Sequence, residues 1–219
     1  MIKVTKHYLH IIQKGEVFMI DYPKLQELDT LLSKCIDEGV TPGMCVSLVT
    51  PEEKWTKCYG NRQIIPSMEP ATLDTIWDLA SCSKVISTAT CIMKLVEEGI
   101  LTLDTKISEV FPDFSEKEIT IKQCITHSSG LPADINGYKA MSKEEMIYAA
   151  LHVKQEEEWI NKVHYSDVNF ILLGMIIAHY KGSLDAYAKE VLFDPLQMIN
   201  TTYNPSPDVK DRCASYEDL

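Results

Sequence analysis

The sequence predicts an α+β protein, in which an antiparallel sheet is layered against helices and a helical region lies beside it. Three observations support this: a one-faced helical stripe near the start, two β-rich runs after it, and helical patterns through most of the remainder. A chain of 219 residues has room for one large domain or two small ones. Its composition, 45% hydrophobic and 24% charged, excludes a disordered chain, a coiled coil and a collagen.

The N-terminal part begins with a helix. Residues 1–20 show no clear period and are expected to form an extension. From Tyr22 to Ile36, apolar residues recur at helical spacing, which is typical of a surface helix with its apolar face turned inward. Gly39 then supplies a left-handed stop.

A β-hairpin is expected to follow this helix. Residues 43–49 and 54–59 are two β-rich runs, and the polar stretch 50–53 joins them, which predicts an antiparallel pair. The helix and the hairpin together make up segment 21–73. A two-stranded hairpin is marginal in water, so the sheet is expected to be incomplete.

Segment 74–200 is predicted to be helical. A helix is expected to begin near Ser81 and to end at Gly99, which can close it. Four later helix starts are marked by capping residues: Thr120 with Gln123, Ser142 with Glu145, Ser166, and Ser183. The tail 201–219 has no clear period and is predicted to be a loop.

The formal net charge of −11 argues against nucleic-acid binding, because such a protein must present a basic patch. The seven cysteines are odd in number and none stand in a C-x-x-C pair, so we expect buried, reduced thiols rather than disulfides or a zinc ribbon. With no signal-peptide pattern at the N-terminus, these thiols favour the cytoplasm. The longest apolar run, 170–178, is too short to span a membrane.

The stretch from Leu79 to Met93 suggests chemistry. Its residues are small or apolar except for Lys84, and Ser81 lies three positions before this lysine, on the same helix face. Burial of an unpaired ammonium is relieved by a lowered pKa or by a specific partner. A neutral lysine can take the serine proton, while the helix N-terminus offers N–H groups to an oxyanion. A capping serine and a lysine that reaches the surface are the alternatives.

Four segments in order carry a family resemblance: TIWDLASCSK (75–84), IMKLVEEG (92–99), ITHSSGLP (125–132) and YSDVNFILLG (165–174). Together they resemble the penicillin-binding-protein-like serine hydrolases, the superfamily of serine β-lactamases, D-alanyl-D-alanine carboxypeptidases and related esterases. The resemblance covers roughly residues 40–205, lies nearest the class C and esterase-like branch, and implies a β-lactamase/transpeptidase-like fold. It implies that Ser81 is the acylated nucleophile, Lys84 its proton acceptor or relay, and Tyr165 the group that shuttles a proton to the leaving atom.

This sequence departs from the family pattern in two places. The usual Tyr-x-Asn is here Tyr165-Ser-Asp167, and a carboxylate cannot donate a hydrogen bond to a substrate carbonyl. An ionised Asp167 near Lys84 would hold the lysine protonated, which favours esters over amides; alternatively, Asp167 faces away at the first turn of a helix. The late Lys-Thr-Gly or His-x-Gly motif is also absent, since Lys181-Gly182-Ser183 lies between two predicted helices.

We therefore expect an acyl-serine hydrolase acting on a small ester, acyl-peptide or β-lactam-like substrate, with no cofactor, metal, nucleic acid or membrane partner. The alternative is a catalytically crippled ligand-binding or interaction module. The missing motif and strands also suggest the first part of a longer protein, in which an open sheet edge invites self-association. His127 in a turn and the pair His7 and His10 are weaker candidates for catalysis and for metal binding.

Overall fold

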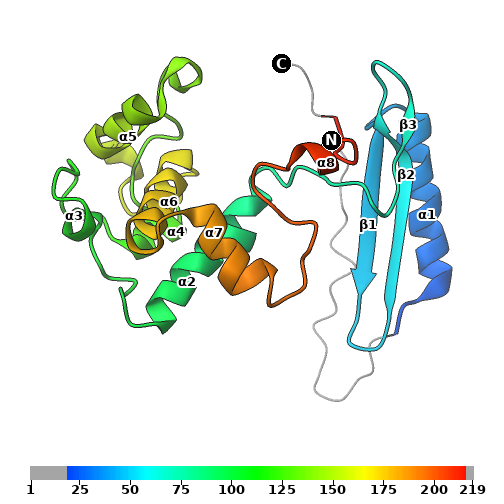
Figure 1. Cartoon of the computed structure of the whole chain (residues 1–219), viewed down its shortest axis with the longest axis horizontal. Helices are drawn as coiled ribbons and strands as arrows, with labels where there is room; N and C mark the ends of the chain where they lie inside the picture. Colours follow the sequence, from blue (N-terminus) through cyan, green and yellow to red (C-terminus); the bar gives the residue numbers. More distant parts are fainter. Residues whose placement is uncertain (1–18, 216–219) are drawn as a thin grey trace. The chain divides into compact units, whose positions relative to one another are not determined.

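The computed structural model describes residues 19–215, in two compact units (Figure 1). Of the described residues, the first unit contains 19–78 and 206–215, and the second is Leu79–Pro205. The division falls after Asp78 rather than after residue 73, and residues 206–215 of the tail join the first unit. The expected N-terminal extension lies outside the described residues except for its last two, and so do His7 and His10.

The first unit begins with α1, Tyr22–Asp37, the helix that the apolar stripe predicts. Asp21 caps it by accepting a hydrogen bond from the Lys24 N–H, at 3.2 Å. Gly39 follows the helix with φ of 69°, a left-handed conformation that glycine adopts without strain. The predicted stop is therefore confirmed.

The sheet is antiparallel, in the order β1-β2-β3. Its strands are β1, Gly43–Val49, β2, Lys54–Gln63, and β3, Glu69–Pro70. The first two form the predicted hairpin, in a register that places Val49 opposite Lys54 and Gly43 opposite Gly60. The short third strand was not predicted, because two residues are too few to show a period.

Helix α1 covers one face of the hairpin (Figure 1). The Tyr59 hydroxyl donates to Asp29 of the helix at 2.6 Å, and Lys57 forms an ion pair with the same carboxylate. On β1, exposure alternates with a period of two, so that Cys45, Ser47 and Val49 are exposed. These three residues therefore belong to the face that α1 does not cover.

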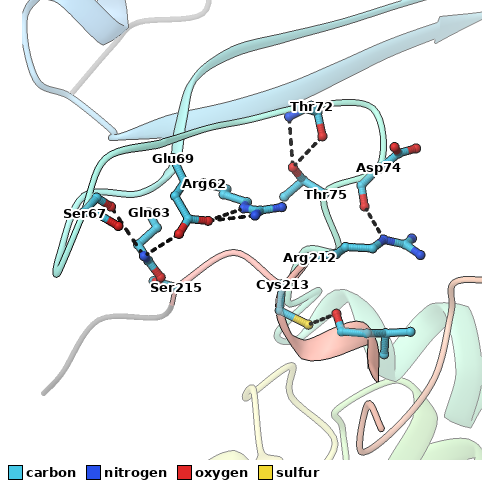
Figure 2. A network of polar contacts seen from close by, with 11 residues as sticks. Arg62, Gln63, Ser67, Glu69, Thr72, Asp74, Thr75, Arg212, Cys213 and Ser215 are labelled. Carbon is cyan, nitrogen blue, oxygen red and sulfur yellow. Dashed lines mark hydrogen bonds and ion pairs between the residues drawn. The ribbon is translucent and has the colours of Figure 1, made fainter. Parts of the chain in front are cut away.

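The tail, residues 206–215, is held in the first unit by backbone hydrogen bonds. Figure 2 shows side-chain contacts in the same region, such as that of the Arg212 guanidinium with the Asp74 carbonyl at 3.2 Å. The Ile76 N–H donates to the Arg212 carbonyl at 2.9 Å, and the Ala214 N–H donates to the Ile76 carbonyl at 2.8 Å. The Ser215 N–H donates to the carbonyl of Arg62, whose guanidinium is bound to Glu69 of β3 at 2.7 Å. Pairing between residues so far apart in sequence leaves no local pattern.

The loop prediction for 201–219 needs a correction. A short helix, α8, spans Pro207–Lys210 within this tail. Its first residue is a proline, whose fixed φ suits a first helical turn and whose missing N–H costs no hydrogen bond there. Four residues are too few for an apolar period, so Ser206 followed by Pro207 was the available signal.

The second unit is helical. Its α-helices are α2, Thr90–Glu97, α3, Ile107–Val110, α4, Ile121–Ile125, α5, Lys143–His152, α6, Asp167–Lys181, and α7, Leu184–Ala188. Two π-helical turns, η1, Lys84–Ala89, and η4, Lys189–Phe193, and two 3-10 turns, η2, Tyr138–Ala140, and η3, Glu157–Trp159, complete it.

Helix α6 is the centre of this unit. It contacts α2, α4, α5, α7 and η1, and its apolar side chains on several sides are buried, as expected for a helix without a polar face. The predicted caps are confirmed at the starts of four helices: Thr120, Ser142, Ser166 and Ser183 each accept a hydrogen bond from a first-turn N–H. The α+β prediction with an open antiparallel sheet is confirmed.

The cysteines are less buried than expected. All seven are free thiols, but Cys91 and Cys124 alone among them are buried. Cys45 and Cys82 are exposed, so the expectation of buried thiols is wrong for them. Within residues 19–215, no helix is long and apolar enough to cross a membrane.

Candidate active site

Ser81 lies at the start of the long helix that η1 and α2 form. The preceding residue, Ala80, has φ of 43°, in the left-handed region that a residue with a Cβ rarely adopts. Such strain persists where the surrounding fold imposes it, and it is concentrated at functional sites. The turn leaves the Ser81 side chain exposed.

Lys84 lies one turn further along the helix, and its amine reaches the serine. Its Nζ donates to the Ser81 Oγ at 3.0 Å. The lysine side chain is 16% exposed, so the ammonium is largely withdrawn from water. The predicted juxtaposition of the two side chains is therefore present in the described structure.

The same ammonium contacts two groups from the start of α6. It lies 2.9 Å from Asp167 Oδ1 and 5.2 Å from the centroid of the Tyr165 ring. Burial by itself lowers the pKa of Lys84, but the contacts with Tyr165 and Asp167 and the charges of these two groups outweigh burial and raise the pKa of Lys84 above its ordinary value. Lys84 is thus an ammonium with partners rather than a neutral amine.

Asp167 combines the two arrangements that the sequence left open. It is the first residue of α6, where a carboxylate is favoured by the helix dipole, and it also pairs with Lys84. Its side chain is 47% exposed as a whole, but the paired oxygen, Oδ1, is itself buried, so solvent weakens the pairing only in part. As the sequence indicated, the negative charge of Asp167 stabilises the protonated form of Lys84, which makes Lys84 a weaker base.

His127 supports Tyr165, a role that the sequence alone did not indicate. The two rings are stacked, with centroids 4.4 Å apart and an angle of 26° between their planes. His127 Nδ1 accepts a hydrogen bond from the Ser166 N–H at 3.0 Å, and φ of the histidine is 53°. Burial and the charge of Lys84 lower the pKa of His127, which keeps the ring neutral. The predicted turn histidine is confirmed, and it also packs against the candidate tyrosine.

Two serines fix the loop that carries these groups. Ser166 Oγ donates to the Pro132 carbonyl at 2.6 Å and accepts from the Asn169 N–H at 3.4 Å. Ser129 Oγ donates to Asn169 Oδ1 at 2.6 Å, and both of these residues are fully buried. Because buried polar groups without partners are costly, these bonds hold segment 125–132 against the start of α6. The loop therefore supports the three residues from Tyr165 to Asp167.

The second unit thus brings together the four residues that the sequence singled out: Ser81, Lys84, Tyr165 and Asp167. Within the described residues, the Ser81 N–H has no hydrogen-bond acceptor, so this donor can serve an oxyanion. Lys181 ends α6 and Ser183 caps α7, so the segment between them is a helix junction, as expected.

Comparison with known proteins gives one family match and several similar proteins. A family model described as "Beta-lactamase" matches residues 28–219. "Protein flp" from Staphylococcus aureus (strain MW2) is 30% identical over 195 residues, which are 81% of this chain and 38% of the relative. The "Putative D-alanyl-D-alanine carboxypeptidase" of Escherichia coli (strain K12) is 27% identical over 207 residues, which are 83% of this chain and 48% of that protein. The chain spans less than half the length of these curated relatives.

Solved structures agree with the fold. A D-amino acid amidase from Ochrobactrum anthropi SV3, complexed with L-phenylalanine amide, matches with a TM-score of 0.68 and 28% identity, over 86% of this chain and 57% of the amidase chain. A class C beta-lactamase matches with a TM-score of 0.77 and 23% identity, over 89% of this chain and 55% of the other. The second likeness bears on the fold alone.

Proposed function

The chain belongs to the beta-lactamase family, and on that premise we propose that it is a serine hydrolase whose reaction passes through an acyl-enzyme on Ser81. The observation that carries this proposal is the 3.0 Å contact between Lys84 Nζ and Ser81 Oγ, at a lysine that is largely withdrawn from water. A hydrolase is also the class that the amidase and carboxypeptidase relatives share by name.

In the proposed acylation, Ser81 Oγ attacks the carbonyl carbon of the substrate. Lys84 accepts the serine proton while it passes one of its own to Tyr165, so that it works as a relay rather than as a neutral base. Tyr165, whose ring centroid lies 5.2 Å from the Lys84 nitrogen, gives its own proton to the leaving atom as it takes up the one from Lys84. The Ser81 N–H stabilises the oxygen that becomes negative.

The substrate that we propose is a small ester, an acyl-peptide or a β-lactam-like compound, with the ester preferred. An Asp167 carboxylate accepts hydrogen bonds and donates none, so it offers no hydrogen bond to the carbonyl of an amide substrate. An ester has the better leaving group and needs less assistance. The pairing of Asp167 with Lys84 supports this preference, because it keeps the proton relay weak.

A second candidate function is a binding module that keeps the arrangement around Ser81 and binds a ligand without turnover. One observation favours it: the pKa of Lys84 is raised by its partners, which leaves the serine without a ready base at neutral pH.

One experiment separates the two functions. The protein is treated with a fluorescent penicillin or a fluorophosphonate, the adduct is located by mass spectrometry, and hydrolysis of an activated ester is then measured. An adduct on Ser81 with ester turnover supports the hydrolase, and an adduct without turnover supports the binding module. Ser81→Ala is the control, and ester cleavage that persists unchanged in it removes Ser81 from both accounts.

We further propose that the protein acts in the cytoplasm on small molecules. The odd number of cysteines, seven, and the lack of a C-x-x-C pair in the sequence support reduced thiols and therefore a reducing compartment. In the described part of the chain, β1 is paired along one edge only, which supports self-association through the other edge. Sedimentation over a range of protein concentrations tests the self-association, and a mass that stays monomeric at every concentration rejects the self-association.

A further inference from the structure

Two cysteines face each other across the hairpin of the first unit. Cys45 of β1 and Cys58 of β2 are direct partners in the antiparallel register. The Cys58 thiol donates to the Cys45 sulfur, and the two Sγ atoms are 2.9 Å apart. The two sulfur atoms are therefore in contact without a covalent bond.

The backbone places this pair at the closer type of cross-strand position. Antiparallel partners alternate between hydrogen-bonded and non-hydrogen-bonded pairs. At the two ends of the hairpin, the Thr50 N–H donates to the Glu53 carbonyl at 2.8 Å, and the Asn61 N–H donates to Pro42 at 2.8 Å. These two end pairs are hydrogen-bonded, and the pair type changes at every residue along the strand. Cys45 lies an odd number of residues from both Thr50 and Pro42, so it belongs to a non-hydrogen-bonded pair, whose Cα atoms lie about 4.5 Å apart. This is within the range of roughly 4.4–6.8 Å that a disulfide accepts.

The pair is also accessible. Cys45 is exposed and Cys58 is half-buried, on the sheet face that α1 does not cover. The neighbouring pair on this face, Ser47 and Thr56, joins its hydroxyl groups at 2.8 Å. By contrast, Cys91 and Cys124 are buried. Reagents in solution can therefore reach the facing thiols.

From this geometry we propose that Cys45 and Cys58 are a redox modification site, at which a hydroperoxide converts the two thiols into a cross-strand disulfide. The disulfide locks the register of β1 on β2. The proposal is independent of the hydrolase chemistry, because it concerns the first unit and Ser81 lies in the second.

The reaction takes two balanced steps. The Cys45 thiol loses its proton, its sulfur attacks one peroxide oxygen, and the O–O bond breaks. A sulfenic acid and a hydroxide are formed, and the hydroxide takes up the proton that the thiol lost and becomes water. The Cys58 sulfur then attacks the Cys45 sulfur, which releases a second water and forms the S–S bond. In total, two thiols are oxidised and one hydrogen peroxide is reduced to two waters. Burial and the facing Cys45 raise the pKa of the Cys58 thiol to about 11, so Cys58 keeps its proton while Cys45 reacts with the peroxide.

The test is peptide mapping of the folded protein. The protein is treated with hydrogen peroxide, free thiols are alkylated, and the digest is analysed with and without prior reduction. We expect one cross-linked peptide pair that joins Cys45 to Cys58, lacks two hydrogen atoms, and is lost on reduction. In Cys58→Ser, the Cys45 sulfenic acid is expected to persist and to react with dimedone.

A matched control moves one thiol along the same strand. The double variant Cys45→Ser with Ser47→Cys keeps the number of thiols and the exposed face, but makes the pair diagonal, with Cα atoms about 7–8 Å apart. It is expected to form at least tenfold less of the cross-link to Cys58. The proposal is overturned if peroxide leaves both thiols alkylatable, oxidises them singly without a cross-link, or links two copies of the chain. Equal cross-linking in the diagonal variant also overturns it.

Discussion

Replacement of Asp167 by asparagine should speed acylation of Ser81 at neutral pH. The carboxylate lies 2.9 Å from the Lys84 ammonium, and at that distance a pair of unit charges attracts by about 6 kcal/mol at an effective dielectric constant of about 20. Because the Asp167 side chain is 47% exposed, solvent screening reduces the net contribution to about 1–2 kcal/mol. Removal of that stabilisation lowers the pKa of Lys84 and raises its neutral fraction about five- to thirtyfold.

The assay is the second-order rate constant for a fluorophosphonate adduct on Ser81, measured between pH 6 and pH 10. In Asp167→Asn, the rising limb should move to lower pH, and the rate near pH 7 should increase by the factor given above. Glu158→Gln removes an exposed carboxylate of the same unit and should leave the profile unchanged. In the double variant with Lys84→Met, the gain should vanish. An unchanged profile, or one that moves to higher pH, would refute the role assigned to the ion pair.

Three further predictions concern the second unit. The pKa of His127 in the folded protein is below the ordinary histidine value of about 6.5, so the unfolded chain takes up the proton first as the pH falls. The free energy of unfolding should therefore decrease below about pH 6.5, and denaturant titrations should show a smaller decrease in His127→Gln. Ser129→Ala leaves the buried Asn169 Oδ1 without its donor and should cost about 1–3 kcal/mol in the same titration, whereas an unchanged midpoint contradicts the buried pair. Phe114→Ala empties a fully buried site and should cost about 3–5 kcal/mol, against less than about 0.5 kcal/mol for the exposed Glu158→Gln.

The elements that the sequence predicted are those whose stabilisation is local. Capping serines and threonines mark helix starts because their hydroxyl groups bind an N–H three residues on, as Ser142 does with Glu145. The hairpin follows from two β-rich runs and a polar connection. By contrast, β3 and the attachment of the tail depend on pairing between distant segments, such as Ile76 with Cys213, and no local period records such pairing.

In the site, as in the fold, the local contact was predictable from the sequence and the tertiary contacts were not predictable from local spacing. The helical spacing of Ser81 and Lys84 placed their side chains together, and the structure shows that contact. The approach of Tyr165 and Asp167 to Lys84 is a tertiary contact, which the sequence supplied through family resemblance alone. The stacking of His127 on Tyr165 was not predicted, because a histidine in a turn gives no indication of the ring it packs against. The sequence also left open whether the pKa of Lys84 is lowered by burial or raised by a partner. The distances from Lys84 to Asp167 and to Tyr165 decide in favour of a raised pKa.

The most direct test of the central claim compares the fluorophosphonate labelling rate of Ser81 in the native protein and in Lys84→Met, with circular dichroism to verify folding. Loss of the amine that touches the serine hydroxyl is predicted to slow labelling about 10²–10⁴-fold, while Ser83→Ala, a change at a serine that donates to Ala80, leaves it unaltered. Equal labelling of the native protein and the folded methionine variant, or an adduct on a residue other than Ser81, would contradict the account.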